Sequence, residues 1–162
     1  SPVVGYRFND RFSAGIGLSY QYFRYKNGSE VFNTSTQQYE YHSPSGSIIS
    51  PSIWGRCFIF DRLFASVIGE YNFNYRTDFA PALIYGNGIE KVKLNYGVPS
   101  ALVGLGYAQP ITNNASFVFL VSYDVLQSAT TRTVLDSQGN AYMVTSPYYR
   151  TLDVRIGVNL GF

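Results

Sequence analysis

The stretch TLDVRIGVNLGF, residues 151–162, decides the fold because apolar side chains alternate with polar or small ones along its whole length. The apolar positions are Leu152, Val154, Ile156, Val158, Leu160 and Phe162. A period of two predicts a β-strand, and this one is longer than the roughly five or six residues usual in globular proteins. A tilted strand needs about nine to eleven residues to cross a bilayer. The stretch therefore predicts a membrane-spanning strand.

The same alternation recurs upstream. The other segments that carry it are 3–8, 11–25, 46–60, 63–76, 96–111 and 115–126. We read 38–60 as one bent strand; splitting it at Ser43–Gly46 is the alternative. Tight turns at Asn9-Asp10, Asp61-Arg62 and Thr112–Asn114 alternate with longer polar loops near 26–38, 77–90 and 135–141. Short turns alternating with long loops are typical of outer-membrane barrels.

Composition excludes several classes of protein. Aromatic residues make up 17% of the chain and charged residues only 14%, and no apolar run is long enough for a membrane helix. A net charge of +2 without a basic cluster predicts no nucleic-acid partner. Cys57 is the only cysteine, and no metal-binding spacing of Cys and His occurs, so we expect no metal and no cofactor. We expect a single domain over 1–162, with any export signal removed or upstream.

The number of predicted strands is an odd number, seven. Bacterial single-chain barrels have an even number of strands, and seven alternating segments are visible. We therefore expect an all-β, antiparallel, up-and-down barrel of about eight strands. Its first strand would lie upstream of Ser1 or come from a partner, since an open seam leaves backbone groups unpaired in lipid.

Alternation does not by itself say which face meets lipid. A soluble, lipocalin-like barrel would turn the apolar rows inward. Here the opposite rows carry Gly, Ser and Asn rather than many charges, and the aromatic residues gather at two heights, as membrane interfaces select. The band near the tight turns is Phe8, Phe12, Phe58, Phe60, Phe64, Tyr107, Phe117 and Phe162. The band near the long loops is Tyr20, Tyr22, Tyr25, Tyr71, Tyr75, Tyr123, Tyr148 and Tyr149. These bands predict apolar rows in contact with outer-membrane lipid.

Charged residues occur on the predicted inner face. They are Arg7, Arg56, Glu70, Asp124, Asp153 and Arg155. Eight strands enclose an interior just wide enough for side chains to fill it, and buried charges there must pair or be hydrated. We expect an ion-pair network that plugs the lumen. The alternative is a narrow channel or proton path.

The sequence SPVVGYRF followed by NDRFSAGIGL, residues 1–18, is similar to a hairpin found in small outer-membrane barrels of Bacteroidota, of the OmpA and OmpX type. The resemblance to this family extends over the whole chain. Residues 49–65 and 96–107 look like further hairpins, and the strand ending in Phe162 resembles the signal read by the barrel-assembly machinery. The resemblance implies location in the outer membrane, a strand before the first hairpin, and in some members a place in a larger complex.

Two further features concern activity and partners. His42, with Ser43 and either Glu40 or Glu30, would be the only candidate for an outer-leaflet lipid hydrolase; we read it instead as a rim histidine and expect no enzyme. The loop 77–90 is unusually apolar, and such patches often mark contacts. Its candidate partner residues are Pro81, Leu83, Ile84 and Tyr85. We expect an accessory barrel beside a larger outer-membrane complex.

Overall fold

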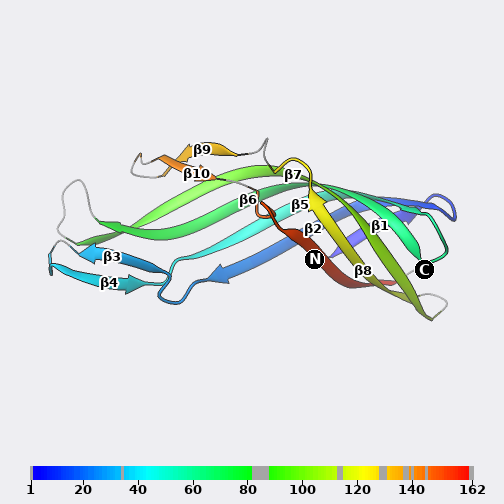
Figure 1. The fold of residues 1–162 in the computed structure, drawn as a ribbon, viewed down its shortest axis with the longest axis horizontal. Helices are drawn as coiled ribbons and strands as arrows, with labels where there is room; N and C mark the ends of the chain where they lie inside the picture. The colour runs from blue at the N-terminus through cyan, green and yellow to red at the C-terminus, as the bar shows by residue number, and fades with distance from the viewer. Residues whose placement is uncertain are drawn as a thin grey trace.

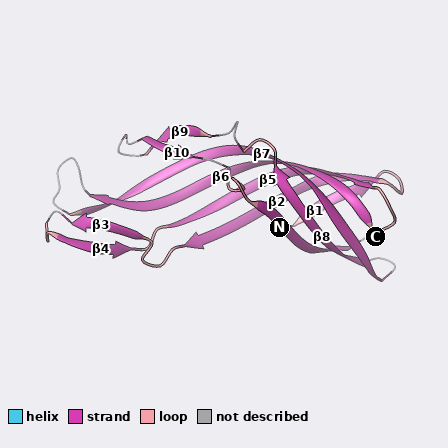
Figure 2. Ribbon diagram, viewed as in Figure 1, coloured by secondary structure: helices cyan, strands magenta, loops and turns pink. Residues whose placement is uncertain are grey.

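Every regular element among the residues that the structure describes is a β-strand. The computed structural model describes residues 2–33, 35–81, 88–112, 115–127, 131–136, 139, 141–144 and 146–160. Seven strands form one antiparallel sheet in the order β1-β2-β5-β6-β7-β8-β11 (Figures 1 and 2). They are β1 (Val3–Arg7), β2 (Phe12–Arg24), β5 (Ser45–Phe58), β6 (Leu63–Pro81), β7 (Ile89–Thr112), β8 (Ala115–Asp124) and β11 (Leu152–Leu160). The described residues include no helix able to cross a membrane.

Two small hairpins that the sequence reading did not predict stand outside this sheet. They pair β3 (Ser29–Asn33) with β4 (Gln38–His42) and β9 (Arg132–Leu135) with β10 (Ala141–Val144). The prediction of one bent strand over 38–60 is wrong, because β4 ends at His42 and a new strand begins at Ser45. Since β4 pairs only with β3 among the described strands, the split adds no strand to the main sheet.

The hairpin of β6 and β7 is longer than predicted. Its ladder continues through Thr77↔Lys93 to Pro81↔Ile89, into the segment expected to be a loop. Val92 and Leu94 are buried there, and this burial supports the extension. Residues 91–96 do alternate between polar and apolar side chains, but 77–81 do not, and the sequence reading assigned the whole segment 77–90 to a loop.

The sheet curls into an antiparallel half-barrel. The β3–β4 hairpin lies at one end, here called the hairpin end, and the short turns between β1 and β2 and between β5 and β6 lie at the other, the turn end (Figure 1). Arg155 of β11 reaches Glu70 of β6, three strands away in the sheet, at 2.8 Å. Arg56 of β5 donates a 3.5 Å hydrogen bond to Asn159 of β11, four strands away. Such contacts across the concave side require strong curvature.

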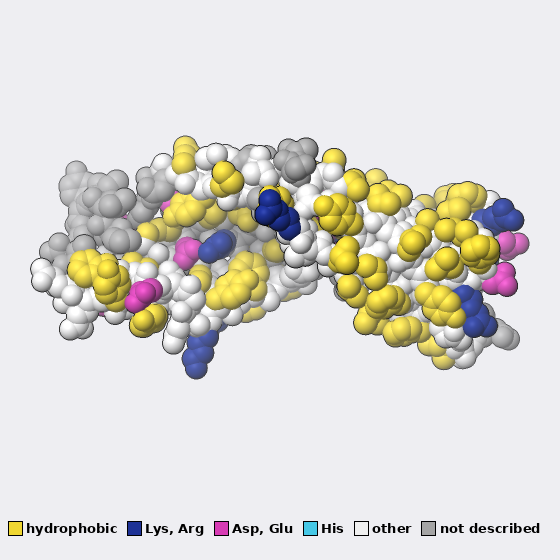
Figure 3. Space-filling model, viewed as in Figure 1, with side chains coloured by type: hydrophobic (Ala, Val, Ile, Leu, Met, Phe, Trp, Pro, Cys, Tyr) yellow, Lys and Arg dark blue, Asp and Glu magenta, His cyan; other side chains and the backbone are white. Residues whose placement is uncertain are grey.

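The two faces of the sheet differ as alternation predicts. On β6 the concave positions Ser66, Ile68 and Glu70 are buried, whereas Val67 and Tyr71 on the convex face of the same strand are 56% and 41% exposed. The register carries this alternation across the neighbouring strands. Figure 3 shows hydrophobic side chains covering much of the half of the molecule nearer the turn end, with charged side chains at the tip.

A small apolar core fills the concave side toward the turn end. It consists of Phe64, Ile68, Leu102, Ala108, Val118, Leu120 and Tyr148, with Trp54 and Phe58 packed against it. The assignment of Phe64 to an outward aromatic band is therefore wrong, since its ring is fully buried and covers Gly106. Its even number places it on the same face as Ser66. Tyr148 is likewise buried, not in an outer band.

Replacing Gly15 by Ala is expected to destabilise the fold by about 1–3 kcal/mol, the usual cost of overpacking. A Cβ at Gly15 would lie 2.0 Å from the carbonyl oxygen of Val4 and 2.8 Å from the Trp54 ring. The matched control is Gly55→Ala, where a Cβ meets nothing within 4 Å. The control should be neutral or slightly stabilising, because alanine restricts the unfolded chain. Equal midpoints of urea unfolding for the two variants would contradict the predicted packing.

Candidate functional site: a charge cluster on the concave face

The most buried ion pair of the described residues joins Glu70 and Arg155. The Glu70 side chain on β6 is 1% exposed, and its Oε1 lies 2.8 Å from Nη2 of Arg155 on β11. Alternation places both residues on the concave face, and the curl of the sheet brings the two strands together across it. A buried carboxylate needs such a partner, because an unpaired charge in a low-dielectric interior is very costly.

Two further groups complete this pair. Arg155 Nε donates a 2.6 Å hydrogen bond to Oδ2 of Asp153, its neighbour on the same face of β11. Tyr148, in the turn before β11, donates 2.7 Å from its hydroxyl to Oε2 of Glu70. The Tyr148 hydroxyl also accepts from Arg155 Nη2 at 3.3 Å. The Arg155 guanidinium thus pairs with two carboxylates. The Tyr148 phenol connects the turn before β11 to both β6 and β11.

A second polar network lies closer to the hairpin end and centres on Asp124. Its Oδ1 accepts the backbone N–H groups of Ala101 at 3.1 Å and Leu126 at 3.0 Å. Its Oδ2 accepts the hydroxyl of Ser146 at 2.5 Å. From Ser146 the contacts continue through Ser100 at 2.9 Å to Asn72. Asp124 is completely buried, yet neutral donors rather than a cation satisfy both of its oxygens.

Arg56 lies apart from the other charges. Its guanidinium packs 4.8 Å from the Trp54 ring centroid and 5.1 Å from that of Phe64, so aromatic faces provide much of its surroundings. Its Nη1 also donates a 3.5 Å hydrogen bond to Oδ1 of Asn159 across the half-barrel. Cation–π contacts of this kind stabilise a guanidinium most where water is excluded.

The structure does not bring Arg7 into the cluster. Its guanidinium donates at 3.2 Å to the carbonyls of Asn9 and Asp10 and lies 3.5 Å from the Asp10 carboxylate. The Arg7 side chain is 66% exposed. The expectation failed because Arg7 is at the last position of a short strand, where a long side chain reaches the turn more easily than the interior.

The predicted set thus separates into four parts. Glu70, Asp153 and Arg155 meet; Asp124 forms its own network, and Arg56 and Arg7 are each elsewhere. The sequence reading missed Tyr148, Ser146, Ser100 and Asn72. Strand parity places Asn72 and Ser100 on the inner face. Nothing in the alternation pattern indicates that Ser146 and Tyr148, which precede β11, turn inward.

The convex face, in contrast, carries no charge over most of its height. Between Phe12 and Tyr22 on β2, and at the register-matched positions of the other described strands, it holds no Asp, Glu, Lys or Arg. Its exposed residues include Ile16, Ile53, Val103 and Ile156, each 47% to 67% exposed. Charged residues return to this face at Arg24 and Lys93, near the hairpin end.

His42 lies on the β3–β4 hairpin and stacks on Phe79, with ring centroids 4.5 Å apart. Its Nε2 is 3.7 Å from Glu40 Oε2, while Glu40 Oε1 accepts from Asn33 at 2.6 Å. The Ser43 hydroxyl accepts the backbone N–H of Asn27 at 3.2 Å. The fourth candidate, Glu30, is engaged by Tyr41 across the hairpin, and this hydrogen bond raises the pKa of the Tyr41 phenol. Each candidate group thus has a structural contact with a neighbouring residue.

Three of the four predicted partner residues lie outside the described residues. Pro81 ends β6, whereas Leu83, Ile84 and Tyr85 lie outside the described residues, as does Phe162. Within the described part of the chain, no group of three or more His, Cys, Asp or Glu side chains could hold a metal ion. Searches among protein-family models, curated proteins and solved structures found no match to this chain.

Proposed function

We propose that this chain forms most of a small outer-membrane β-barrel, with its convex face in lipid and its concave face closed by side chains. The observation that carries the proposal is the charge-free convex face. A water-facing sheet would carry charges among its apolar residues, and a lipid-facing band carries almost none because a charge near the bilayer centre costs about 2–4 kcal/mol.

The polarity of the two faces also argues against a soluble, lipocalin-like barrel. Such a barrel keeps apolar side chains inside and presents polar ones to water. Here the buried concave positions include Glu70, Asn72, Ser100 and Asp124, and the large side chains exposed on the convex face away from the hairpin end are aliphatic or aromatic. This inverted arrangement is expected of a barrel immersed in lipid.

The role that fits this interior best is structural or accessory. The Glu70–Arg155 pair and the Tyr148 side chain cross the concave side, where a conducting pore would need a continuous water path. The channel alternative therefore has less support. Assembly with a larger outer-membrane complex stays a prediction, motivated by the apolar residues of the segment 77–90.

Fluorescence quenching by brominated lipid tests which face meets the bilayer. Trp54 is the only tryptophan and lies on the concave side, so bromine on the acyl chains should leave its emission nearly unchanged. In the variant Trp54→Phe with Val103→Trp, the new indole stands on the convex face and should be strongly quenched. Quenching of Trp54 alone, or of neither indole, would refute the proposed orientation.

We also propose that one further strand closes the gap between β1 and β11. Among the described strands, β1 pairs only with β2 and β11 only with β8, so each has one open edge. An open edge in hydrocarbon leaves N–H and C=O groups unsatisfied at several kcal/mol each, and closed barrels avoid this cost. The contacts of β11 with β5 and β6 across the half-barrel show that the curl is already strong.

Hydrogen exchange of the lipid-embedded protein tests this closure. If a strand pairs with the open edge of β11, consecutive amides such as Val154, Arg155, Ile156 and Gly157 should all exchange slowly. If the edge stays open to water, only those amides that bond to β8 should be protected, in an alternating pattern. Alternating protection along β11 would exclude the closing strand.

A further inference from the structure

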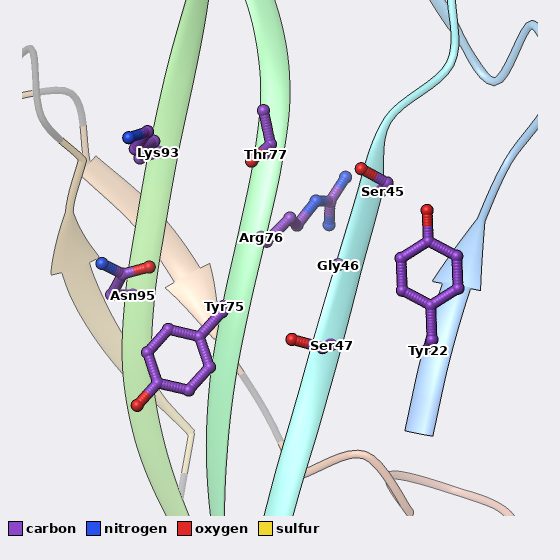
Figure 4. A pocket seen from close by; sticks show the side chains of 9 residues that line it. All are labelled: Tyr22, Ser45, Gly46, Ser47, Tyr75, Arg76, Thr77, Lys93 and Asn95. Atoms are coloured by element: carbon purple, nitrogen blue, oxygen red, sulfur yellow. The ribbon is translucent and has the colours of Figure 1, made fainter. Parts of the chain in front are cut away.

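Arg56 differs from the other arginines that strand register places on the concave face of the main sheet. Each of the others has a carboxylate partner, in the pairs Arg7–Asp10 at 3.5 Å, Arg76–Asp78 at 2.8 Å and Arg155–Glu70 at 2.8 Å. Figure 4 shows Arg76 near the hairpin end, where its side chain extends from β6 toward β5. Arg56 lies closer to the turn end, and no carboxylate in the described part of the chain forms an ion pair with it.

The Arg56 guanidinium also has N–H groups without acceptors. Its only hydrogen bond to a described residue runs from Nη1 to Asn159 at 3.5 Å. Its Nε is buried and has no hydrogen-bond partner among the described residues. The rings of Trp54 and Phe64 pack against the group but supply no oxygen to accept these N–H groups. A carboxylate would supply both the acceptor oxygens and the counter-charge, in the planar geometry that a guanidinium matches.

The space for such a carboxylate lies beside β11. The bond to Asn159 places the Arg56 guanidinium next to this strand, whose other edge has no partner among the described strands. Gly157 shares the concave face with Asn159, and a Cβ added to it would meet nothing within 4 Å. At the opposite edge, a Cβ on Gly5 of β1 would lie 2.3 Å from the Trp54 ring, so that side is already filled. A side chain on the closing strand can therefore approach Arg56 over Gly157.

The two open edges fix the direction of the closing strand. β1 leads into the turn before β2 and so runs toward the turn end, and β11 runs the same way because successive strands of the sheet are antiparallel. Only a strand that runs away from the turn end can pair antiparallel with both edges. A second copy of the described sheet, inserted in the same orientation, offers only edges that run toward the turn end. Its pairing would be parallel, whereas outer-membrane barrels are antiparallel.

We propose that the strand closing the barrel carries an aspartate or glutamate on its inner face, beside Gly157 and Asn159, and that this carboxylate pairs with Arg56. The charge of Arg56, its unused donors and the space over Gly157 all fit this occupant. The inference rests on the proposed function, because it requires the closing strand between β1 and β11.

Two replacements of Arg56 by unbranched side chains test for the carboxylate in the full protein embedded in lipid. Arg56→Lys keeps a cation, whereas Arg56→Met removes it and would leave the acid without a counter-charge. Arg56→Met should therefore raise the unfolding equilibrium constant above that of Arg56→Lys by on the order of a hundredfold, because a stranded buried charge is very costly. Without the acid the order reverses, since Arg56→Met then removes an unpaired cation from the interior. Urea unfolding that finds Arg56→Met as stable as Arg56→Lys, or more stable, would overturn the proposal.

The matched control uses the exposed Arg7–Asp10 pair. Arg7→Met and Arg7→Lys should have similar stability, because an exposed ion pair contributes little. A large difference at Arg7 would show that the two replacements differ for reasons other than a stranded charge, and would also count against the proposal.

Cross-linking identifies the acid itself. A lipid-soluble carbodiimide condenses an amine with a neighbouring carboxylate into an amide and takes up the water that is released. In Arg56→Lys, the amide should join residue 56 to an aspartate or glutamate of the closing strand, as mass spectrometry of the digested protein would show. An amide to Asp153 or Glu70, or no amide at all, would overturn the proposal.

Hydrogen exchange along β11 separates the two kinds of failure. If all consecutive amides of β11 exchange slowly but Arg56→Met is the more stable variant, the barrel is closed and this inference alone is wrong. Alternating protection along β11 would instead show that the closing strand of the proposed function is absent, and both proposals would fall.

Discussion

Replacing Val67 by Arg is expected to lower the free energy of unfolding of the lipid-embedded barrel by about 2–4 kcal/mol. Val67 is 56% exposed on the convex face of β6, with Val103 as its register partner on β7. It lies between the two aromatic bands, so the new guanidinium would enter the hydrocarbon near the middle of the bilayer. Urea unfolding from vesicles measures the change.

The matched control for Val67→Arg is Thr77→Arg. Thr77 lies on the same strand and the same face, ten residues closer to the hairpin end, in one row with Arg24 and Lys93. The cost of a charge falls to about 0–1 kcal/mol near the interface, so the control should change stability little. Were the convex face in water, both variants would be nearly neutral. Equal effects at the two positions would therefore count against the membrane orientation.

Replacing Arg155 by Met is expected to destabilise the protein by about 3–5 kcal/mol, because Glu70 would stay buried without a counter-charge. The exposed pair Arg76–Asp78 has the same 2.8 Å separation, and its side chains are 44% and 25% exposed. Arg76→Met should therefore cost no more than about 1 kcal/mol. The two ion pairs have the same N–O distance and differ in how deeply their side chains are buried. Urea unfolding of both variants measures the two changes in stability.

A double variant tests whether the Glu70–Arg155 pair acts as a unit. Adding Glu70→Gln to Arg155→Met removes the stranded carboxylate, so the double variant should be more stable than the sum of the two single changes implies. Strict additivity would contradict the coupling. Single-channel recording of the wild type and of these variants tests whether the side chains around Glu70 and Arg155 close the interior. Ion flow through the wild-type protein would show that they do not.

Most strands of the main sheet can be predicted from the sequence, because apolar and polar side chains alternate wherever the two faces of a strand have different surroundings. The alternation along 151–162 and 63–76 identifies the strands, and parity alone assigns Glu70, Asp153 and Arg155 to one side. Their meeting depends on the curl of the sheet and on strand order. Short turns that join sequential strands make that order predictable.

The remaining features depend on contacts that alternation does not record. The Tyr148 hydroxyl meets Glu70 because an irregular turn folds inward, and the small hairpins are paired only locally. The prediction that Arg7 lies in the interior was wrong, because its flexible side chain at the end of β1 binds the carbonyl groups of the following turn. Phe64 was assigned to the outward aromatic band from its distance to the nearest turn. Its position in the alternation of β6 places it on the inner face.

The contact between Tyr148 and Glu70 also has a consequence for the order of assembly. The two residues are 78 positions apart in the chain, and Arg155 follows Tyr148 by seven more. The β6–β7 hairpin is local and can pair early, whereas contacts of such long separation form slowly because a long loop must close first. Glu70 should therefore remain hydrated until β11 docks. Loss of that water would mark the last step of folding, when the C-terminal strand joins the sheet.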